Sequence, residues 1–357
     1  MTVRVNKPSF NIREKLSELG RKFGLKGSEL AAAETVQEAR DLVSAGRKNL
    51  IINGAMEVAQ RATSVTGSSG SAVLTLDRFQ NHGSGGTYNS SQETVTNGGM
   101  PGLPIKFKKY FKFSVTTGAN NCGIWQTIED VRTVQGEHTF SFYAKGTNPS
   151  GGTLEVDARQ YFNGSSDVDS LIGSFVLTDT WQRFTFTFTP PSLSGKTIGA
   201  NNYYRIFIRQ PDADNSTGAW HIDTTGWQLE AGRNATEFEH RSYGEELSLC
   251  QRYYGKIRLS NQEWIYSESS AASHKWWMGY IPFSMRANPN IDSTDLTGGI
   301  GVSGLSGTVS STSPATPGDT PGRVSMRVTM SANSGTARAI YHTDGWAGDY
   351  LAFDAEL

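Results

Sequence analysis

The sequence predicts a mainly β protein in three parts, on the strength of three observations. The chain has 357 residues, more than one compact core usually holds, which favours two folded units and an appendage. Its 39 glycines, with abundant serine, threonine and asparagine, suit short strands joined by tight turns. Apolar and polar residues alternate through the middle of the chain, as in sheets that are buried on one face. We therefore expect a helical N-terminal arm (1–48), a jelly-roll or β-sandwich domain (49–243), and a short helix with a smaller C-terminal β domain (244–357).

The N-terminal arm has the pattern of two short amphipathic helices. Asn11 and Glu14 form a capping pair for the first helix, and the second helix is expected over 28–45. The apolar stripes are too thin to bury a core of their own, so we expect the arm to pack on partner proteins or on copies of itself. The alternative is a frayed tail. The residues predicted to lie in the interface are Ile12, Leu16, Leu19 and Leu30.

The middle of the chain contains runs in which every second residue is apolar. Side chains two residues apart on a strand share a face, so each run predicts one buried face and one wet face. The sets expected to point inward are Phe140, Phe142 and Ala144; Leu154, Val156 and Ala158; Phe184, Phe186 and Phe188; and Tyr204, Ile206 and Ile208. Glycine-rich turn clusters separate the runs, which is typical of a sandwich or jelly roll.

The C-terminal part is predicted to be a second, smaller β region. The stretches "KWWMGYIPFSMRANPNI" (275–291) and "RVSMRVTM" (323–330) have the composition of strands. Between them, residues 295–322 are rich in glycine, serine, threonine and proline, and we expect a long loop or a partly mobile insertion there.

Charge and cysteine content exclude several classes of function. The formal net charge of −1 gives no field that would attract nucleic acid, so no nucleic-acid partner is expected. No stretch is apolar enough for a signal peptide or a membrane span, which predicts synthesis in a cytoplasm without membrane insertion. The two cysteines, Cys122 and Cys250, are expected to be free thiols.

The densest group of reactive side chains lies in "EFEHRSYGEELSLCQRYYGK", residues 237–256. On an extended segment Glu237 and Glu239 would share a face and His240 would point away from them. Glu245 and Glu246 fall in the first turn of a helix, where carboxylates offset the helix dipole. The spacing of Leu247, Cys250, Tyr253 and Tyr254 suits a helix that buries Cys250. No third group orients a nucleophile here, so the stretch is predicted to be a joint between domains, and no catalytic residues are assigned.

Metal-binding patterns are weak in this sequence. The run "DADNSTG" places Asp212 and Asp214 at alternate positions, as a calcium loop does. Its glycine falls one position late and no downstream glutamate matches, so a turn is the favoured interpretation and no metal site is predicted.

Aromatic residues provide the functional hypothesis that remains. Sugar-binding sandwiches stack sugar rings on exposed aromatic faces and bind hydroxyl groups with neighbouring polar side chains. The alternative for each ring is the hydrophobic core. Adjacent residues on a strand face opposite sides, so either Trp276 or Trp277 must lie at a surface or an interface. The candidate ligand-binding residues are Trp125, Tyr143, Tyr161, Trp276 and Trp277.

Four stretches of the chain resemble a known family. "RKNLIINGAMEVAQR" (47–61) followed by "LDRF" (76–79) resembles the start of the β-sandwich in tail fibre proteins of marine tailed phages, especially podoviruses that infect cyanobacteria. "EFEHRSYGEELSLCQRYY" is similar to the domain junction of that family, "IPFSMRANPNI" to the opening strand of its distal domain, and "YLAFDAEL" to its C-terminal ending.

The resemblance implies a homotrimeric virion protein. Its arm would bind the adaptor or nozzle proteins of the tail, and its central domain would be a carbohydrate-binding jelly roll. Such domains often hold a structural calcium ion near their last strands, and Asp223 stands where a ligand would lie, although its neighbours depart from the usual acidic pattern. No other cofactor is implied.

The sequence therefore predicts a tail fibre, made in the host cytoplasm and assembled into the virion, that adsorbs to a host surface polysaccharide or lipopolysaccharide without enzymatic activity. One alternative is a fibre that also cleaves the polysaccharide, which would require paired carboxylates in a groove. The other is a purely structural tail component.

Overall fold

The computed structural model describes residues 48–356 with gaps. The gaps are 69–72, 85, 97–98, 105, 117–119, 151, 212–217, 259–264, 272–273, 281, 288, 293–299, 304–308, 316–322, 331–338 and 343–349. In β14, β15 and β17 to β20, introduced below, the description covers the backbone alone. The predicted arm with Ile12, Leu16, Leu19 and Leu30, and the aspartates Asp212 and Asp214, lie outside the described residues.

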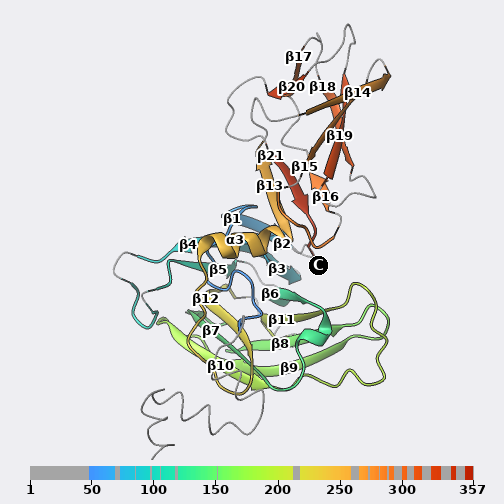
Figure 1. Ribbon diagram of the computed structural model, residues 1–357. Coiled ribbons are helices and arrows are strands. Elements are labelled where there is room, and N and C mark those ends of the chain that lie inside the picture. Colours follow the sequence, from blue (N-terminus) through green and yellow to red (C-terminus); the bar gives the residue numbers. More distant parts are fainter. Residues whose placement is uncertain are drawn as a thin grey trace, which may run out of the picture.

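Two antiparallel six-stranded sheets face each other in the middle of the chain (Figure 1). The first has the order β1-β4-β5-β12-β7-β10 and is called sheet A; the second has the order β2-β3-β6-β11-β8-β9 and is called sheet B. The strands of sheet A are Ser64–Ser68, Thr87–Thr94, Lys109–Val115, Trp220–Ala231, His138–Thr147 and Gln182–Phe188. The strands of sheet B are Val73–Leu74, Phe79–Ser84, Asn120–Glu129, Tyr203–Arg209, Leu154–Tyr161 and Val168–Phe175. A short 3-10 helix, η1 (Val131–Thr133), follows β6.

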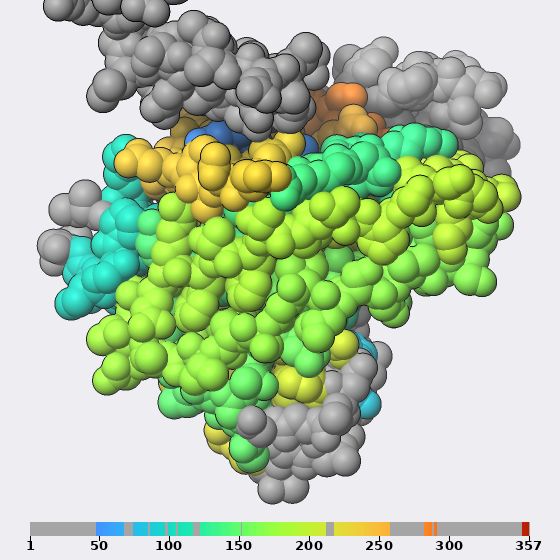
Figure 2. Space-filling model, turned by 90° about the horizontal axis from the view of Figure 1, so that it is seen from below, coloured from blue at the N-terminus to red at the C-terminus, as the bar shows by residue number. Residues whose placement is uncertain are grey.

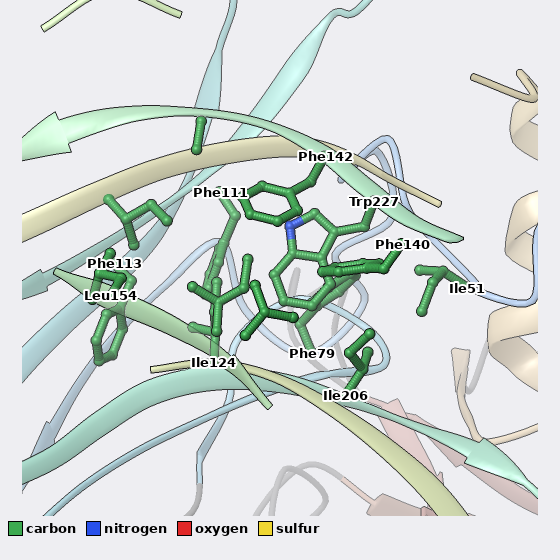
Figure 3. Close-up of a cluster of buried hydrophobic side chains, with 14 of the residues drawn as sticks. Ile51, Phe79, Phe111, Phe113, Ile124, Phe140, Phe142, Leu154, Ile206 and Trp227 are labelled. Carbon is green, nitrogen blue, oxygen red and sulfur yellow. The ribbon is translucent and has the colours of Figure 1, made fainter. Parts of the chain in front are cut away.

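The hydrophobic core lies between the two sheets, as the alternating runs predict. The inward sets of β7, β8 and β11 are buried, and those of β10 pack against the core while remaining partly exposed at the edge of sheet A. Trp227 is fully buried among Phe79, Phe140 and Phe142 (Figure 3), with ring centroids 5.2, 5.2 and 6.1 Å from its own. Its indole nitrogen donates to Thr224 Oγ1 at 2.8 Å, so its one polar atom is satisfied inside the core.

A β-bulge in β12 allows Trp227 to point inward. The pairing of β12 with β7 shifts register between Thr225 and Gln228, which adds one residue to β12. Gly226 takes a φ of 67° there, and a Cβ on it would come within 2.7 Å of the Phe107 ring. Glycine is therefore required at this position for both backbone and space.

The edge strands β9 and β10 end the two sheets on the same side of the sandwich. Figure 2 views the molecule from this side, where the surface is formed mainly by the yellow-green segment that contains β8, β9 and β10. Leu171 and Val176 are exposed at 64% and 52% here. Isolated exposed apolar residues of this kind are ordinary on a protein surface.

Helix α3 (Tyr243–Gln251) leads from the sandwich to smaller sheets (Figure 1). Strands β13 (Tyr254–Arg258) and β16 (Asn290–Asp292) both pair with β21 (Tyr350–Asp354), which brings the end of the chain back to the helix. Four strands form the sheet β14-β15-β19-β18 and two pair as β17-β20. Their bounds, from β14 to β20 without β16, are Ile265–Ala271, His274–Tyr280, Ile300–Ser303, Val309–Ala315, Arg323–Met330 and Ala339–His342.

Two predictions for this part are wrong in detail. The stretch 275–291 is not one strand, because β15 ends at Tyr280 and β16 begins only at Asn290. Pro282 and Pro289 lie between them and lack the N–H that a strand ladder needs. The expected loop at 295–322 contains β17 and β18, since its serines and threonines pair in antiparallel strands despite their low hydrophobicity.

None of the helices in the described part of the chain has the length and apolar character needed to span a bilayer.

Candidate functional site

The predicted joint at 237–256 ties the start of the described chain to helix α3. Glu239 accepts a hydrogen bond from the backbone N–H of Asn49 at 2.8 Å, and Glu246 accepts one from the backbone N–H of Asn53. Arg241 donates to the backbone oxygens of Asn49 and Ile51. These carboxylates are therefore occupied by backbone donors and an arginine, as a structural joint requires.

The asparagines of the 47–61 motif complete this joint. Asn49 Oδ1 accepts from the backbone N–H of Ile51 and of Leu229, at 2.9 and 3.1 Å. Asn53, at a φ of 61°, donates its side-chain amide to the backbone oxygens of Val58 and Asp77, at 2.8 and 3.0 Å. Both side chains are buried, and each satisfies backbone groups in a segment that belongs to no strand.

The helix is shorter than the predicted spacing suggested. Cys250 is fully buried, as expected, but the helix ends at Gln251, so Tyr253 lies in a turn and Tyr254 begins β13. Their rings instead stack under Arg78 and Arg61, at 3.4 and 3.7 Å from the guanidinium carbons. Cation–π contact with the sandwich therefore replaces helical packing.

Both cysteines are free and buried. Burial raises the pKa of Cys122 to about 11 and raises that of Cys250 well above its usual range. The reactive form of cysteine is the thiolate, so neither residue is suited to nucleophilic chemistry at neutral pH.

The predicted ligand-binding residues are divided between the two sheets. Trp125 on β6 and Tyr161 on β8 both point to the outer face of sheet B, because their neighbours Ile124 and Gln160 point into the core. Tyr143 lies on β7, on the outer face of sheet A. Trp276 and Trp277 lie on β15, and their side chains lie outside the described residues.

Tyr143 belongs to a small second core that covers sheet A. Its ring lies 5.4 Å from that of Phe107, which also contacts Phe238 at 5.1 Å. The buried members of this cluster are Val95, Leu103, Phe107 and Trp181. Segments that precede β5 and follow β12 therefore cover the outer face of sheet A, and Tyr143 is separated from Trp125 and Tyr161 by the thickness of the sandwich.

The outer face of sheet B brings Trp125 and Tyr161 together with residues of β11. Strand register places Phe207 directly opposite Trp125 on one side and Asp157 on the other, and Tyr203 opposite Tyr161. We call the outward side chains of β6, β11 and β8, with their neighbours on β3 and β9, the sheet B face.

Aromatic rings form the surface of the sheet B face. Tyr161 and Tyr203 stack with their ring centroids 4.5 Å apart and their planes at 17°. Trp125 contacts Phe207 at 5.5 Å and His82 at 5.7 Å, and donates from its indole nitrogen to Gln80 Oε1 at 2.6 Å. These contacts leave only 9% of Trp125 exposed, whereas Tyr161 and Tyr203 are half-buried. The tyrosine pair is therefore the more accessible platform.

Arg205 lies at the centre of these rings. Its guanidinium carbon is 4.6, 5.3 and 5.9 Å from the ring centroids of Tyr203, Trp125 and Phe207. Nε donates to Thr127 Oγ1 at 2.9 Å, and in the described part of the chain the two terminal nitrogens have no hydrogen-bond partner. Burial lowers the pKa of Arg205 from its ordinary value, but an arginine stays charged in a protein. The face thus presents planar donors flanked by aromatic rings.

On the outer face of β8, β9 and β11, three carboxylates balance three arginines. Arg159 donates to both oxygens of Asp169, at 2.6 and 2.8 Å, and this pairing lowers the pKa of Asp169. Arg209 pairs with Asp157 and lies 3.8 Å from Glu155. With Arg205 as the third arginine, the outer face of these three strands has no net charge, which suits a hydroxyl-rich ligand.

Sequence reasoning missed Tyr203, Arg205 and Phe207 as site residues. The run "YYRIFIRQ" (203–210) predicts a strand with Tyr204, Ile206 and Ile208 on its inward face, and these three residues are buried. Its outward residues combine aromatic rings with arginines where a wet face usually carries serine or threonine. That departure is the signal that could have identified them.

Lysines, rather than further acids, lie beside Asp223, the candidate calcium ligand. Asp223 is buried on β12, lies 3.6 Å from Lys145 and pairs by register with Lys112. Burial raises its pKa. The described residues contain no group of three or more histidine, cysteine, aspartate or glutamate side chains placed to hold a metal.

Comparison with known families adds one match. The family described as "Carbohydrate binding domain" matches residues 105–200, less than a third of the chain. The matched segment begins just before β5 and ends just before β11. The chain therefore contains a β-sandwich of the carbohydrate-binding-module type, and this match supports carbohydrate binding. No curated protein sequence matches the chain.

Several solved structures are similar to it at low identity. They include the N-terminal cellulose-binding domain of β-1,4-glucanase C from Cellulomonas fimi, with 18% identity over 41% of this chain and 90% of that chain and a TM-score of 0.28. The family 11 carbohydrate-binding module from Clostridium thermocellum shares 17% over 49% and 99%, with a TM-score of 0.28. The enzymatically active domain of bacteriophage CBA120 tailspike protein 4 shares 18% over 51% and 21%, with a TM-score of 0.33. Scores of this size carry no argument, and the family match alone supports the assignment.

Proposed function

We propose that this protein is a phage tail fibre that binds a host surface glycan through the sheet B face. One observation carries the proposal: Arg205 lies among Tyr203, Trp125 and Phe207 with its terminal nitrogens unpaired in the described part of the chain. Sugar rings stack their C–H faces on aromatic side chains, and their hydroxyl groups accept hydrogen bonds from guanidinium donors. The carbohydrate-binding-module match to residues 105–200 supports the same class of ligand.

The virion role rests on the sequence resemblance. The motifs at 47–61 and 76–79, which resemble the start of the tail-fibre sandwich, supply the buried joint residues Asn49, Asn53 and Asp77. We propose that the arm attaches the fibre to adaptor or nozzle proteins of the tail and that the fibre is a homotrimer. Three copies of a weak site gain strength through effective concentration, so each face can bind weakly. The host polysaccharide or lipopolysaccharide is bound without being cleaved, and no cofactor is required.

The test measures binding of the full-length protein to host cells with purified surface polysaccharide as competitor. The variants Tyr203→Ala and Arg205→Ala should each weaken binding. Tyr243→Ala is a matched control, because Tyr243 is 54% exposed at the start of α3, away from the sheet B face. Equal binding by all four proteins would contradict the assignment of the site.

Two further readouts test the remaining parts of the proposal. The mass in solution should be three times that of the chain, and any other stoichiometry would contradict the trimer. The chain length of the polysaccharide should be the same before and after incubation, and shortening would identify a depolymerase instead.

A further inference from the structure

A cavity of about 390 Å³ opens where the sandwich meets the C-terminal part of the chain. Glu129, Asp130 and Arg132 line it from the end of β6 and from η1, and Asn202 lines it from the residue before β11. Arg252 follows α3, and Arg286 lies between β15 and β16. We call this cavity the joint pocket.

We propose that the joint pocket binds the carboxylate of an acidic sugar, a uronic acid unit of the glycan that lies on the sheet B face. This inference rests on the proposed function and names the chemical class of its ligand.

The charges of the joint pocket favour an anion. Three guanidinium groups line it against two carboxylates, in contrast to the balanced charges on the outer face of β8, β9 and β11. Glu129 is shared by two of the arginines, accepting from Arg252 at 2.8 Å and lying 3.2 Å from Arg286. Burial raises the pKa of Glu129, but hydrogen bonding and charge from these arginines outweigh it and lower the pKa overall. With three arginines against two carboxylates, the joint pocket has one positive charge in excess.

Arg132 supplies the donors for a ligand. It reaches both oxygens of Asp130 through Nη1 alone, at 3.1 Å each. Nε and Nη2 of Arg132 therefore have no hydrogen-bond partner in the described part of the chain. These two nitrogens form the edge of a guanidinium group that binds a carboxylate through two parallel hydrogen bonds. The side chain is 56% exposed, so a ligand can reach it without unfolding the joint.

The joint pocket continues the sheet B face. Strand register places Glu129 directly opposite Tyr203, on the side of Tyr203 away from Tyr161. Directly opposite residues on antiparallel strands have Cβ atoms about 5 Å apart, roughly the length of one sugar ring. A saccharide stacked on the tyrosine pair therefore places its next unit at the pocket. This continuity is what selects an acidic sugar rather than an unrelated anion.

Paired polymers that differ only in charge test the inference on the full-length protein. Polygalacturonate and alginate are each compared with their alkyl esters, which keep the sugar backbone and remove the carboxylate charge. Carrageenan, which is sulfated, is compared with neutral agarose. Binding is measured by the retardation of the protein in gels that contain each polymer.

The acidic uronates should bind about tenfold more tightly than their esters, as expected for one or two charge-assisted hydrogen bonds. Arg132→Gln and Arg252→Gln should each reduce this preference while leaving binding to the esters unchanged. Lys108→Gln, which removes one exposed positive charge beside sheet A, should retain it. Salt at 0.5 M should weaken binding of the acids and not of the esters.

The contrary outcomes at the joint pocket are distinguishable from a failure of the proposed function. Equal binding of acids and esters, or a preference that survives both arginine variants, would overturn the joint pocket while Tyr203→Ala still tests the sheet B face. Tighter binding of carrageenan than of the uronates would replace the carboxylate with sulfate and overturn the ligand class. Failure of every polymer to bind the unaltered protein would count against both proposals.

Discussion

On the outer face of sheet A, Tyr143 packs 5.4 Å from Phe107 under a cover of non-strand segments. On the outer face of sheet B, Tyr203 stacks with Tyr161 and Arg205 and is partly exposed. The two tyrosines occupy outward positions on inner strands and both are partly buried, yet one packs against a second core and the other is part of a proposed binding surface. An outward aromatic residue therefore acquires its role from what covers the sheet, and alternation along the strand cannot reveal it.

The largest expected effect comes from removing the cover of sheet A. Phe107 is 2% exposed and contacts Tyr143, Phe238 and His240. Phe107→Ala should lower the free energy of unfolding by about 3 to 5 kcal/mol, because it leaves a cavity in the second core. Denaturant unfolding followed by circular dichroism measures this. Glycan binding at a temperature where the variant is folded should be unchanged, and a loss of binding would show that the sheet A side belongs to the site.

The pH dependence of the free energy of unfolding is expected to arise in the joint, at Asp77, rather than on either face. Burial raises the pKa of Asp77 to about 6, despite hydrogen bonds from Gln60 and the charge of Arg61. The folded state therefore favours the protonated carboxyl group. Below pH ~4 the group is protonated in both states, and its ionisation has no cost to folding. The free energy of unfolding should fall as the pH rises from about 4 to 6 and then level off.

Asp77→Asn should remove this dependence and stabilise the protein at pH 7 by up to about 3 kcal/mol, the size that a two-unit shift implies. Asp179→Asn, on the exposed connection between β9 and β10, is the control. Urea unfolding at a series of pH values makes the comparison. A less stable Asn variant at pH 7 would mean that the ionised contacts with Gln60 and Arg61 outweigh burial.

A variant of the sheet B face should affect binding more than stability, the opposite of the expectation for Phe107→Ala. Tyr203→Ala should weaken glycan binding about tenfold, since loss of one stacking platform is expected to cost about 1.4 kcal/mol. Its effect on stability should be smaller than that of Phe107→Ala, because Tyr203 is partly exposed whereas Phe107 is buried. Binding titration and unfolding on the same samples check both statements. A large loss of stability without loss of binding would make Tyr203 a structural residue like Tyr143.

The smallest effect is expected at the exposed pair Arg159 and Asp169. The pKa of Asp169 is lowered by its hydrogen bonds to Arg159, so its contribution to stability is present above the unfolded pKa of about 4 and is lost as the pH falls through the lower folded value. Because Asp169 is 62% exposed, Asp169→Asn should change the free energy of unfolding at pH 7 by less than about 1 kcal/mol. A larger change would show that charge pairing, and not only shape, maintains the sheet B face.

Local pattern was enough to predict the β-sandwich. Phe140 and Phe142 lie two residues apart, as do Ile206 and Ile208, and the period of two assigns each pair to one buried face whatever the other strands do. The position of Glu245 and Glu246 in the first turn of a helix was also predictable, because they follow the capping residue Ser242.

The candidate site was only half predictable, because it is made by strands far apart in the chain. Trp125 and Tyr161 could be named from the sequence, but their position on one face with Arg205 follows from β11 lying between β6 and β8. No local signal gives that strand order. The joint pocket is more distant still, since Glu129, Arg252 and Arg286 meet only because α3 and the C-terminal part of the chain pack against the end of the sandwich.

The sequence by itself thus determined which residues form strands and which side of each strand is buried, since period and composition act locally. Tertiary structure decided which outward residues are covered and which arginines meet which carboxylates. Tyr143 and Tyr203 differ for this reason: the segments that cover the first are close to it only in the folded chain.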